Sequence, residues 1–400
     1  MKYLVLLGDG MADTPLDILG GKTPLDVADK PLIDSLAKKS VIGMTRTVPP
    51  TLSPGSDVAN LSVMGYNPLE CYTGRSPLEA VSMGVELLDT DVTLRCNLVT
   101  LSDEENYEDK TMVDYSSGEI STPEARELIR AVNDALGTDK KQFFGGISYR
   151  HLLVCHNDKT GRDLTPPHDI SDKKITQYLP SDPEMTELIK KSNDILKNHP
   201  INIERIKNGK NPANSIWLWG EGTRPALENF KEKYGFSGSV VSAVDLIKGI
   251  GMCAGMNVVE VEGVTGTLST NYMGKAQAAV NEFRSGADFV YLHFEASDEC
   301  GHQGDCPGKV KAIENLDHPV LSYIVDELKK DGEDFALLFM PDHPTPVKLK
   351  THTRDEVPFM LYKSNDEKDF PENVYTEKCA EASGIKVENA YDLVSMLFTL

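Results

Sequence analysis

The chain has 400 residues, 40% of them hydrophobic, and a formal net charge of −21 at pH 7. A chain of this length exceeds one ordinary core, so we expect two domains. The strong negative charge argues against nucleic acids and anionic membranes as partners. An anionic substrate would therefore have to be held by metal ions or arginines placed locally.

No apolar run reaches membrane-spanning length, and Lys2-Tyr3 leads straight into an apolar strand, so we expect no signal peptide. The seven cysteines show no C-x-x-C spacing. We therefore expect the cysteines to be reduced thiols and the protein to be cytoplasmic. Cys300 and Cys306 flank a polar loop discussed below. They could ligate a metal, but buried or incidental thiols are the simpler interpretation.

The N-terminal part alternates strand and helix patterns. Lys2 to Asp9 is a continuous apolar run that ends in Gly8-Asp9-Gly10, which predicts a buried strand with an acid at its carboxyl tip. Pro31 to Ser40 reads as a helix that begins with proline, and Val41 to Val48 as a strand.

Ser56 follows a Pro54-Gly55 turn and precedes a predicted short helix, Asp57 to Met64. At that position its hydroxyl lies near unpaired backbone N–H groups and the positive end of the helix dipole. An ordinary N-cap is one interpretation. The other is a nucleophile that becomes phosphorylated, which requires a cation beside it to favour deprotonation.

The middle of the chain contains further α/β material. The patterns predict strands at Val92 to Leu101 and Tyr149 to Cys155, and helices from Ser121 to about Leu136 and from Asp182 to Lys197. Beyond it we expect the chain to return to the first domain, through strands near Ile216 to Trp219 and Asn257 to Val261 and a helix from Tyr272 to Ser285.

Two more apolar strands end in possible metal ligands. Ala287 to Phe294 is followed by Asp298 and His302, four residues apart, and Asp334 to His343 ends in Asp342-His343. His352 follows on a loop before the apolar run Val357 to Tyr362. Open parallel sheets bind ligands at the carboxyl ends of their strands, so we expect these side chains to meet.

Each tip residue taken alone could be a loop acid or a helix cap. Together they suggest two metal sites, one formed by Asp298, His302 and His352 and the other by Asp9, Asp342 and His343. Mixed nitrogen and oxygen ligands suit Mn²⁺ best, with Zn²⁺ or Mg²⁺ as alternatives. Two ions roughly 4 Å apart stabilise the attacking and leaving oxygens of phosphoryl transfer.

In chain order, the motifs are GDG at Gly8, PGSDVANLSVMGYNP at Pro54, DECGH at Asp298, PDH at Pro341 and THTRDEVPF at Thr351. This set resembles the alkaline-phosphatase superfamily and, more narrowly, the archaeal-type cofactor-independent phosphoglycerate mutases. The likeness extends over nearly the whole chain, through YTGRSPLE, RCNLVT, YRH, TPPHD, IWLWG and AVDLIKG.

The resemblance implies an α/β fold: a phosphatase-like three-layer core at 1–87 and 213–400, with a smaller α/β domain inserted at 88–212. It implies interconversion of 3- and 2-phosphoglycerate through a phosphoserine on Ser56, which would also ligate the second metal. The partner would be a small phosphorylated substrate. Substrate-binding candidates in loops and at strand ends are Arg150, His151, His168 and Arg224.

One segment departs from the family pattern. Mutases of this family commonly carry a D-R-R-A-G-R stretch soon after R-C-N-L-V-T, whereas Val113 to Glu119 contains no arginine. That segment resembles a sister group proposed to be homoserine kinases. Because arginine suits bidentate oxyanion binding, an ATP-dependent homoserine kinase is the alternative function. The sequence contains no G-x-x-x-x-G-K-[ST] loop, so nucleotide binding would be unconventional. A phosphohydrolase and a non-enzymatic metal-binding module are further alternatives.

Overall fold

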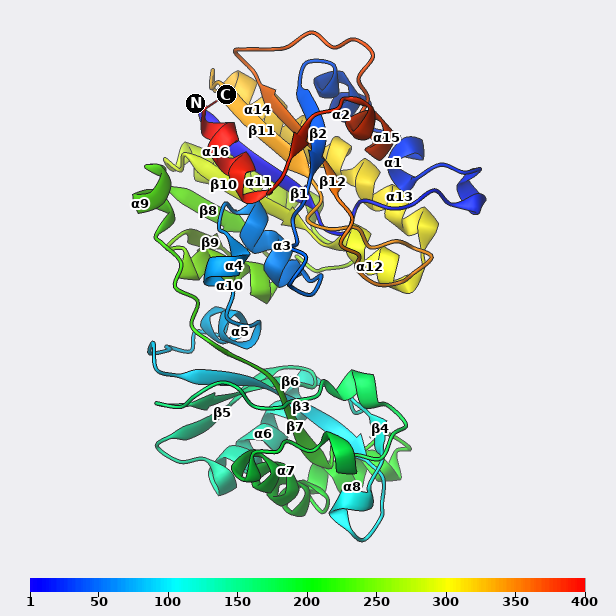
Figure 1. Cartoon of the computed structure of the whole chain (residues 1–400), viewed down its shortest axis with the longest axis vertical. Helices are drawn as coiled ribbons and strands as arrows, with labels where there is room; N and C mark the ends of the chain where they lie inside the picture. Colours follow the sequence, from blue (N-terminus) through cyan, green and yellow to red (C-terminus); the bar gives the residue numbers. More distant parts are fainter. Residues whose placement is uncertain (400) are drawn as a thin grey trace. The chain divides into compact units, whose positions relative to one another are not determined.

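The computed structural model describes residues 1–399 and divides into two compact units. The core unit comprises Met1–Tyr72 and Ala226–Leu400, and the inserted unit comprises Thr73–Pro225. Figure 1 shows each unit built around its own sheet. The two units are described separately below.

The core unit contains an eight-stranded sheet in the order β13-β2-β12-β11-β1-β10-β8-β9. Strand β1 lies between β11 and β10 and is parallel to both, and the parallel pairing continues through β8 and β9. The strands are β1 (Lys2–Gly8), β2 (Val41–Thr45), β8 (Gly238–Val241), β9 (Asn257–Val259), β10 (Phe289–Phe294), β11 (Phe335–Met340), β12 (Val357–Lys363) and β13 (Lys386–Val387).

Helices cover both faces of this sheet, which makes the core unit a three-layer α/β/α structure (Figure 1). Leu4 and Leu6 of β1 lie in the large apolar cluster that includes residues of α11, α13 and α14. The alternate residue Tyr3 faces the other layer, where its ring centroid is 4.8 Å from that of Phe398 in α16. Alternation along a fully buried strand thus supplies apolar side chains to both layers.

Three helices of the core unit were predicted, and the corresponding α2, α3 and α11 begin within one residue of the expected positions. The helices of this unit are α1 (Pro24–Val27), α2 (Pro31–Ala37), α3 (Ser56–Val63), α4 (Pro68–Cys71), α9 (Phe230–Tyr234), α10 (Asp245–Cys253), α11 (Tyr272–Arg284), α12 (Ala296–Gln303), α13 (Cys306–Asn315), α14 (Ser322–Lys330), α15 (Glu377–Ala382) and α16 (Tyr391–Thr399). The three-layer α/β core expected from the resemblance is confirmed.

The inserted unit contains a five-stranded sheet whose described pairings are all antiparallel. Its central strand β3 pairs with β7 on one edge and with β6 and β4 on the other. Helices α6 and α7 cover the face that holds the apolar cluster. The elements are β3 (Val92–Leu101), β4 (Met112–Asp114), β5 (Lys141–Ile147), β6 (Arg150–Cys155), β7 (Ser215–Thr223), α5 (Ser76–Ser82), α6 (Thr122–Leu136), α7 (Pro183–Leu196) and α8 (Pro200–Lys207).

The inserted unit is wider than the 88–212 segment expected from the sequence, because elements at both ends pack onto its sheet. Helix α5 contributes Ala80 to a small apolar cluster with Leu152 and Val154 of β6. The strand near Ile216 to Trp219 does not return to the core. It is part of β7, which pairs with β3. That placement was wrong because an apolar run predicts a strand but does not identify its sheet.

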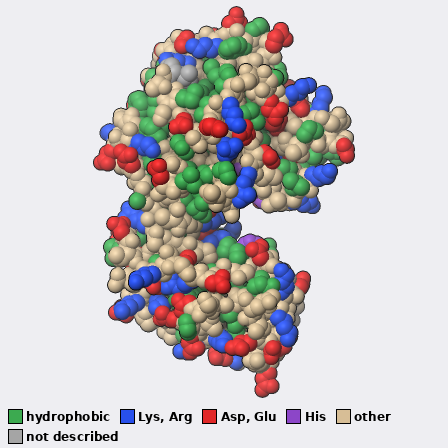
Figure 2. Space-filling view, in the orientation of Figure 1, with side chains coloured by type: hydrophobic (Ala, Val, Ile, Leu, Met, Phe, Trp, Pro, Cys, Tyr) green, Lys and Arg blue, Asp and Glu red, His purple; other side chains and the backbone are tan. Residues whose placement is uncertain are grey.

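Two surface properties bear on possible partners. Among residues 1–399, no helix is both long and apolar enough to cross a membrane. On the face shown in Figure 2, acidic and basic side chains are scattered in small groups. No single large basic area covers that face, which agrees with the net charge of −21.

Candidate metal centre

The parallel strands of the core unit bring the predicted ligands to one edge of the sheet. Gly8 lies opposite Phe294, and Leu7 opposite Met340, so β1, β10 and β11 end at the same level. Asp9 follows β1 directly. Asp298 lies in the first turn of α12, just after β10, and Asp342-His343 follows β11.

Gly10 lets the chain turn between these side chains. Its φ of +60° is a left-handed conformation that favours glycine. A Cβ at this position would lie 2.6 Å from Oδ1 of Asp298 and 2.5 Å from Oγ1 of Thr345. Residue 10 therefore has to be glycine if Asp9 and Asp298 are to approach each other. The Gly10 N–H in turn donates to Oδ1 of Asp342 at 3.0 Å.

The first group of possible ligands consists of Asp9, Asp342 and His343, all buried, with ligand atoms that lie within 4.8 Å of one another. Nε2 of His343 is 3.5 Å from Oδ1 of Asp9 and 3.3 Å from Oδ2 of Asp342. This is the grouping that the sequence predicted for one metal.

The second group is Asp298, His343 and His352, again with ligand atoms within 4.8 Å of one another. His302 lies beside it: its Nε2 is 3.3 Å from Oδ2 of Asp298 and 2.9 Å from Nε2 of His352. The structure thus brings together the three residues predicted for this metal. It also shows that His343 lies within reach of both groups.

Backbone carbonyls orient His302 and His352 so that the two rings face each other beside Asp298. Nδ1 of His302 lies 3.0 Å from the Lys350 carbonyl, and Nδ1 of His352 lies 3.3 Å from the Pro54 carbonyl. A carbonyl accepts only, so each Nδ1 carries a proton, and each Nε2 faces the Asp298 carboxylate. The two Nε2 atoms lie 2.9 Å apart, so a proton or a cation has to lie beside them.

Ser56 is the first residue of α3, and its side chain lies at this cluster. Its Oγ is 3.1 Å from Nε2 of His343. The N-cap of α3 is Gly55, and no side chain caps that helix end. Ser56 is therefore not the helix cap that the simpler interpretation required.

Several supporting residues escaped the sequence analysis. Asn60 donates to Oδ2 of Asp342 at 2.8 Å and accepts from the buried Tyr291 hydroxyl at 2.6 Å. Thr345 hydrogen-bonds to Asp298 and lies 3.3 Å from Nδ1 of His343. In the sequence, the only sign of such a supporting residue is a polar residue within an apolar run. Asn60 lies in such a run, but the run is short.

His293 is the clearest residue of this kind, because it interrupts the apolar strand β10. It is fully buried, and its Nε2 lies 3.0 Å from Oδ2 of Asp9. Its Nδ1 lies 3.2 Å from the Ser242 hydroxyl. A histidine within a buried strand thus fixes the orientation of a carboxylate at the neighbouring strand tip.

The electrostatics of the cluster fit a cation. Burial, followed by the charges of Asp342 and Asp298, raises the pKa of Asp9 well above its usual range. Burial also acts to raise the pKa of Asp298, but hydrogen bonds to His302 and His352 outweigh it and hold that pKa well below the usual range. The hydrogen bond to Asp298 raises the pKa of His302 to about 9.

One atom in particular lacks a partner. Oδ1 of Asp9 is buried and accepts no hydrogen bond within residues 1–399. A buried carboxylate oxygen without a donor is costly, and a metal ion is the partner that its neighbours also suit. The donor set of carboxylates, imidazoles and a serine hydroxyl fits Mn²⁺ or Zn²⁺.

Cys300 and Cys306 are both buried, and neither belongs to a metal-compatible group in residues 1–399. Burial raises the pKa of the Cys300 thiol to about 11, so it is not a ready thiolate ligand. None of the seven cysteines forms a disulfide.

The substrate-binding candidates occupy different places in the inserted unit. Arg150 is exposed at the start of β6, and Arg224 is exposed just after β7. His168 is half-exposed, with its ring centroid 5.3 Å from that of Trp219. His151 is buried within the unit, and its Nδ1 accepts from the Gly146 N–H.

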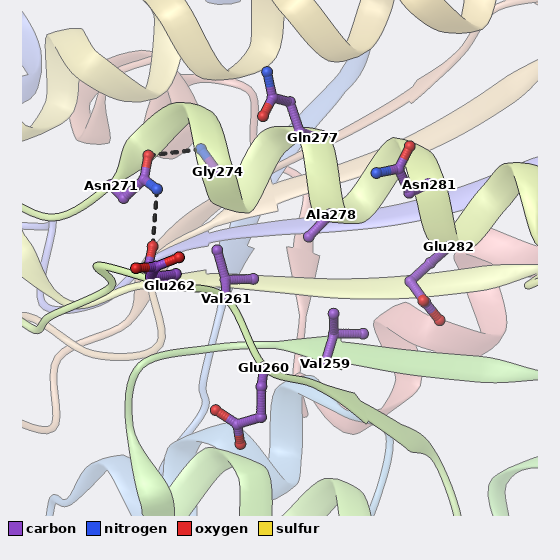
Figure 3. A pocket seen from close by; sticks show the side chains of 10 residues that line it. All are labelled: Val259, Glu260, Val261, Glu262, Asn271, Gly274, Gln277, Ala278, Asn281 and Glu282. Carbon is purple, nitrogen blue, oxygen red and sulfur yellow. Dashed lines mark hydrogen bonds between the residues drawn. The ribbon is translucent and has the colours of Figure 1, made fainter.

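A separate pocket of about 390 Å³ lies between α11 and the segment that follows β9 (Figure 3). At one end of it, Asn271 donates to the Glu262 carbonyl and accepts from the Gly274 N–H (Figure 3). Its lining includes the acidic side chains of Glu260, Glu262 and Glu282 and none of the metal-compatible residues. An anionic substrate is therefore disfavoured there.

Comparisons with known proteins agree with this geometry. The family model described as 2,3-bisphosphoglycerate-independent phosphoglycerate mutase matches residues 37–202. A probable enzyme of that name from Geobacter sulfurreducens is 50% identical over 400 residues, covering 99% of each chain. The chain belongs to the 2,3-bisphosphoglycerate-independent phosphoglycerate mutase family. The resemblance read from the motifs is confirmed.

Another relative and two solved structures are similar to this chain over nearly its whole length. The Methanosarcina barkeri mutase is 48% identical over 402 residues, covering 99% of each chain. The solved cofactor-independent phosphoglycerate mutase of Thermoplasma acidophilum superposes with a TM-score of 0.67 at 25% identity, covering 100% of this chain and 99% of that one. A Pyrococcus horikoshii protein superposes with a TM-score of 0.83 at 29% identity, covering 100% and 96%.

Proposed function

We propose that the protein interconverts 3-phosphoglycerate and 2-phosphoglycerate at the cluster in the core unit. The observation that carries this proposal is Oγ of Ser56, which lies 3.1 Å from Nε2 of His343 among the clustered carboxylates and imidazoles. Membership of the mutase family supports the choice of reaction. The metals predicted from sequence would be held by Asp9, Ser56, Asp342 and His343 and by Asp298, His302 and His352.

In this proposal Ser56 is the nucleophile. Its Oγ loses a proton and forms a bond to phosphorus as the bond from phosphorus to the substrate oxygen breaks, and that oxygen takes up a proton to become a glycerate hydroxyl. The glycerate then reorients, and its other hydroxyl loses a proton as it attacks phosphorus. The bond from phosphorus to Oγ breaks, and Oγ takes up a proton, which restores Ser56. The N-terminus of α3 favours the anionic phosphoserine.

Two divalent ions, Mn²⁺ by preference, would stabilise the charge of the transferring phosphoryl group. Other groups of the chain orient the side chains that would bind these ions. The carbonyls of Lys350 and Pro54 hold the His302 and His352 rings, and Asn60 holds Asp342. Oδ1 of Asp9, which accepts no hydrogen bond within residues 1–399, would be one of the oxygens that bind a cation.

Recognition of the glycerate is assigned to the inserted unit, with Arg150, His168 and Arg224 as the proposed contacts. The absence of disulfides among the seven cysteines supports action in the reducing cytoplasm. The Geobacter sulfurreducens and Methanosarcina barkeri relatives are named mutases and not kinases, so the homoserine kinase alternative gains no support from them.

The test is a coupled assay of purified protein with Mn²⁺, started with 3-phosphoglycerate and followed by formation of 2-phosphoglycerate. Turnover that is removed by a chelator and restored by Mn²⁺ is the expected result. A parallel reaction with ATP and homoserine should be silent. Activity only in that parallel reaction would reject the mutase assignment.

A further inference from the structure

Helix α13 contains a buried lysine that the proposed mechanism does not use. Lys309 is 0% exposed, and its Nζ lies 2.8 Å from Oδ2 of Asp13, whose side chain is also 0% exposed. Removing two charges from water is costly, and apolar residues of similar volume often stabilise a fold as well as a buried ion pair does. Stability alone is therefore a weak reason for a lysine at this position.

The hydrogen bonds of Lys309 join two separate segments of the core unit. Besides Asp13, Nζ donates to the Ala12 carbonyl at 3.0 Å and to the Thr345 carbonyl at 2.9 Å. A lysine ammonium has three N–H donors, and all three are used here. Ala12 and Asp13 follow β1, whereas Thr345 follows β11. One side chain thus ties the segment after β1 to the segment after β11.

These two segments carry the first group of possible metal ligands. Asp9 lies in the segment after β1, and His343 lies in the segment after β11. An isolated bridge between Ala12 and Pro344 is the backbone contact that joins the two segments beside Lys309. From residue 9 to 13 and from 341 to 345, the chain forms no helix or strand beyond such bridges. The distance between the segments therefore depends on cross-links such as Lys309.

Thr345 extends this link to the second group of possible ligands. Its hydroxyl donates to the Asp298 carboxylate, and its Oγ1 lies 3.3 Å from Nδ1 of His343. A Cβ at Gly301 would collide with the Thr345 carbonyl oxygen, which shows how closely α12 packs on this residue. That carbonyl is the one that Lys309 binds. A shift of Thr345 would accordingly move the partner of Asp298.

Asp13 is held in place by bonds of its own. Its Oδ2 also accepts from the Val347 N–H at 3.1 Å, and its N–H donates to Oε1 of Glu377 at 3.1 Å. Glu377, at the start of α15, also accepts from the Thr23 hydroxyl at 2.7 Å. In a buried network whose members are all satisfied, each member constrains the others. The carboxylate that pairs with Lys309 is therefore a fixed anchor.

We propose that Lys309 is a positioning residue for the metal centre, which holds the segments after β1 and β11 at the separation that the two groups of ligands require. Its Nζ bonds to no member of either group. Its effect is indirect, through Ala12 and Thr345. This role rests on the proposed function, in which these ligands hold two divalent ions.

The test is Mn²⁺ binding to the full chain without substrate, measured by calorimetry and by electron paramagnetic resonance of the loaded protein. Two Mn²⁺ ions close together couple magnetically, and the coupling changes with their separation. The variants are Lys309→Met and the double variant Lys309→Met with Asp13→Asn, which leaves no unpaired buried charge. Lys311→Met is the matched control, because Lys311 is exposed on the same helix and pairs with Glu314.

We expect Lys309→Met to weaken Mn²⁺ binding about 10- to 100-fold and to change the magnetic coupling. The double variant should melt at a higher temperature than Lys309→Met by circular dichroism, yet show the same defect in metal binding. Lys311→Met should match wild type in every measurement. Wild-type affinity and coupling in the double variant would overturn the positioning role, since only the charge pair would then matter.

Lys309→Gln decides the outcome if both methionine variants fail to fold. Its amide keeps two N–H donors, so weaker Mn²⁺ binding than in wild type supports the role, and unchanged binding overturns it.

Failure of this role and failure of the proposed function are distinguishable, because Mn²⁺ binding is measured without substrate. Binding and coupling that depend on Lys309, in a wild-type protein that does not turn over 3-phosphoglycerate, keep the role and reject the function. Wild-type turnover, together with normal Mn²⁺ binding in the folded Lys309 variants, keeps the function and rejects the role.

Discussion

The core unit and the inserted unit gather their polar side chains by different means. In the core unit, adjacent parallel strands end at one level, so Asp9, Asp298 and Asp342 meet at the sheet edge. In the inserted unit, antiparallel strands place Arg95 and Arg150 on a sheet face, and α5 brings Arg75 and Glu79 to it.

This difference determines what a sequence reveals. Site residues at a strand tip can be recognised in the sequence, because an acid or histidine directly follows an apolar run. A sheet-face site depends on register between strands distant in sequence, which no single motif contains. Each prediction below changes residues or titrates a group in only one of the two units, so the units are tested separately.

The largest effect is expected at the metal centre of the core unit. Asp298→Asn keeps the shape of the side chain but removes a charge that faces His302 and His352. Metal content should fall, and turnover should drop at least about a thousandfold, roughly 4 kcal/mol of transition-state stabilisation. Elemental analysis and the coupled assay measure the two effects. Glu299→Gln, one residue along α12, is the control. Full metal content with normal turnover in Asp298→Asn would remove this residue from the site.

A second prediction concerns acid unfolding of the inserted unit. Burial, followed by the charge of Arg126, lowers the pKa of His151 to about 3 from an ordinary 6.5. Between these values the unfolded chain binds more protons, so stability is lost as the pH falls from 6.5 toward 3, on the order of 1.4 kcal/mol per pKa unit.

Trp217 and Trp219 are the chain's two tryptophans, and both lie in the inserted unit. Denaturant unfolding followed by their fluorescence therefore reports this unit alone. His151→Asn keeps an acceptor for the Gly146 N–H and should reduce the slope of stability against pH in that window. An unchanged slope would contradict the assigned pKa.

A smaller pH effect is expected for the core unit, at alkaline instead of acidic pH. Lys275 is fully buried, and its Nζ donates to the His293 carbonyl at 2.8 Å. Burial lowers its pKa to about 8 from 10.5. The unfolded chain binds more protons between these values, so stability should rise as the pH increases from 8 to 10.5. Circular dichroism of wild type and Lys275→Met tests this. The variant should lack the rise, and a rise of equal size in both proteins would refute the assignment.

The smallest expected effect concerns a residue that supports the metal centre without joining it. Asn60→Ala removes the donor to Asp342 and should weaken metal binding about 10- to 100-fold. Excess Mn²⁺ should restore turnover, which a general loss of structure would not allow. Tyr291→Phe, which removes the hydroxyl that Asn60 accepts from, should show a weaker form of the same defect. Loss of turnover that no Mn²⁺ concentration restores would contradict a supporting role.

The sequence predicted the central strands β1, β10 and β11, a short helix directly after Ser56 and the convergence of strand tips, because buried parallel strands have continuous apolar runs. It did not predict β4, β5, β8 or β13. It missed His293 and Thr345, since a buried polar residue shows its partner only in three dimensions. It assigned β7 to the wrong sheet. It treated Arg150 as a single candidate because the register that joins it to Arg95 is not local.

The central claim is the covalent step on Ser56, and trapping the intermediate tests it most directly. The wild-type enzyme, loaded with Mn²⁺ and turning over phosphate-labelled 3-phosphoglycerate, is stopped in acid and digested. Label should appear on the peptide that contains Ser56 and be absent from Ser56→Ala, which should remain folded. A digest with no labelled peptide, together with near-normal turnover of Ser56→Ala, would show that Ser56 is not the nucleophile.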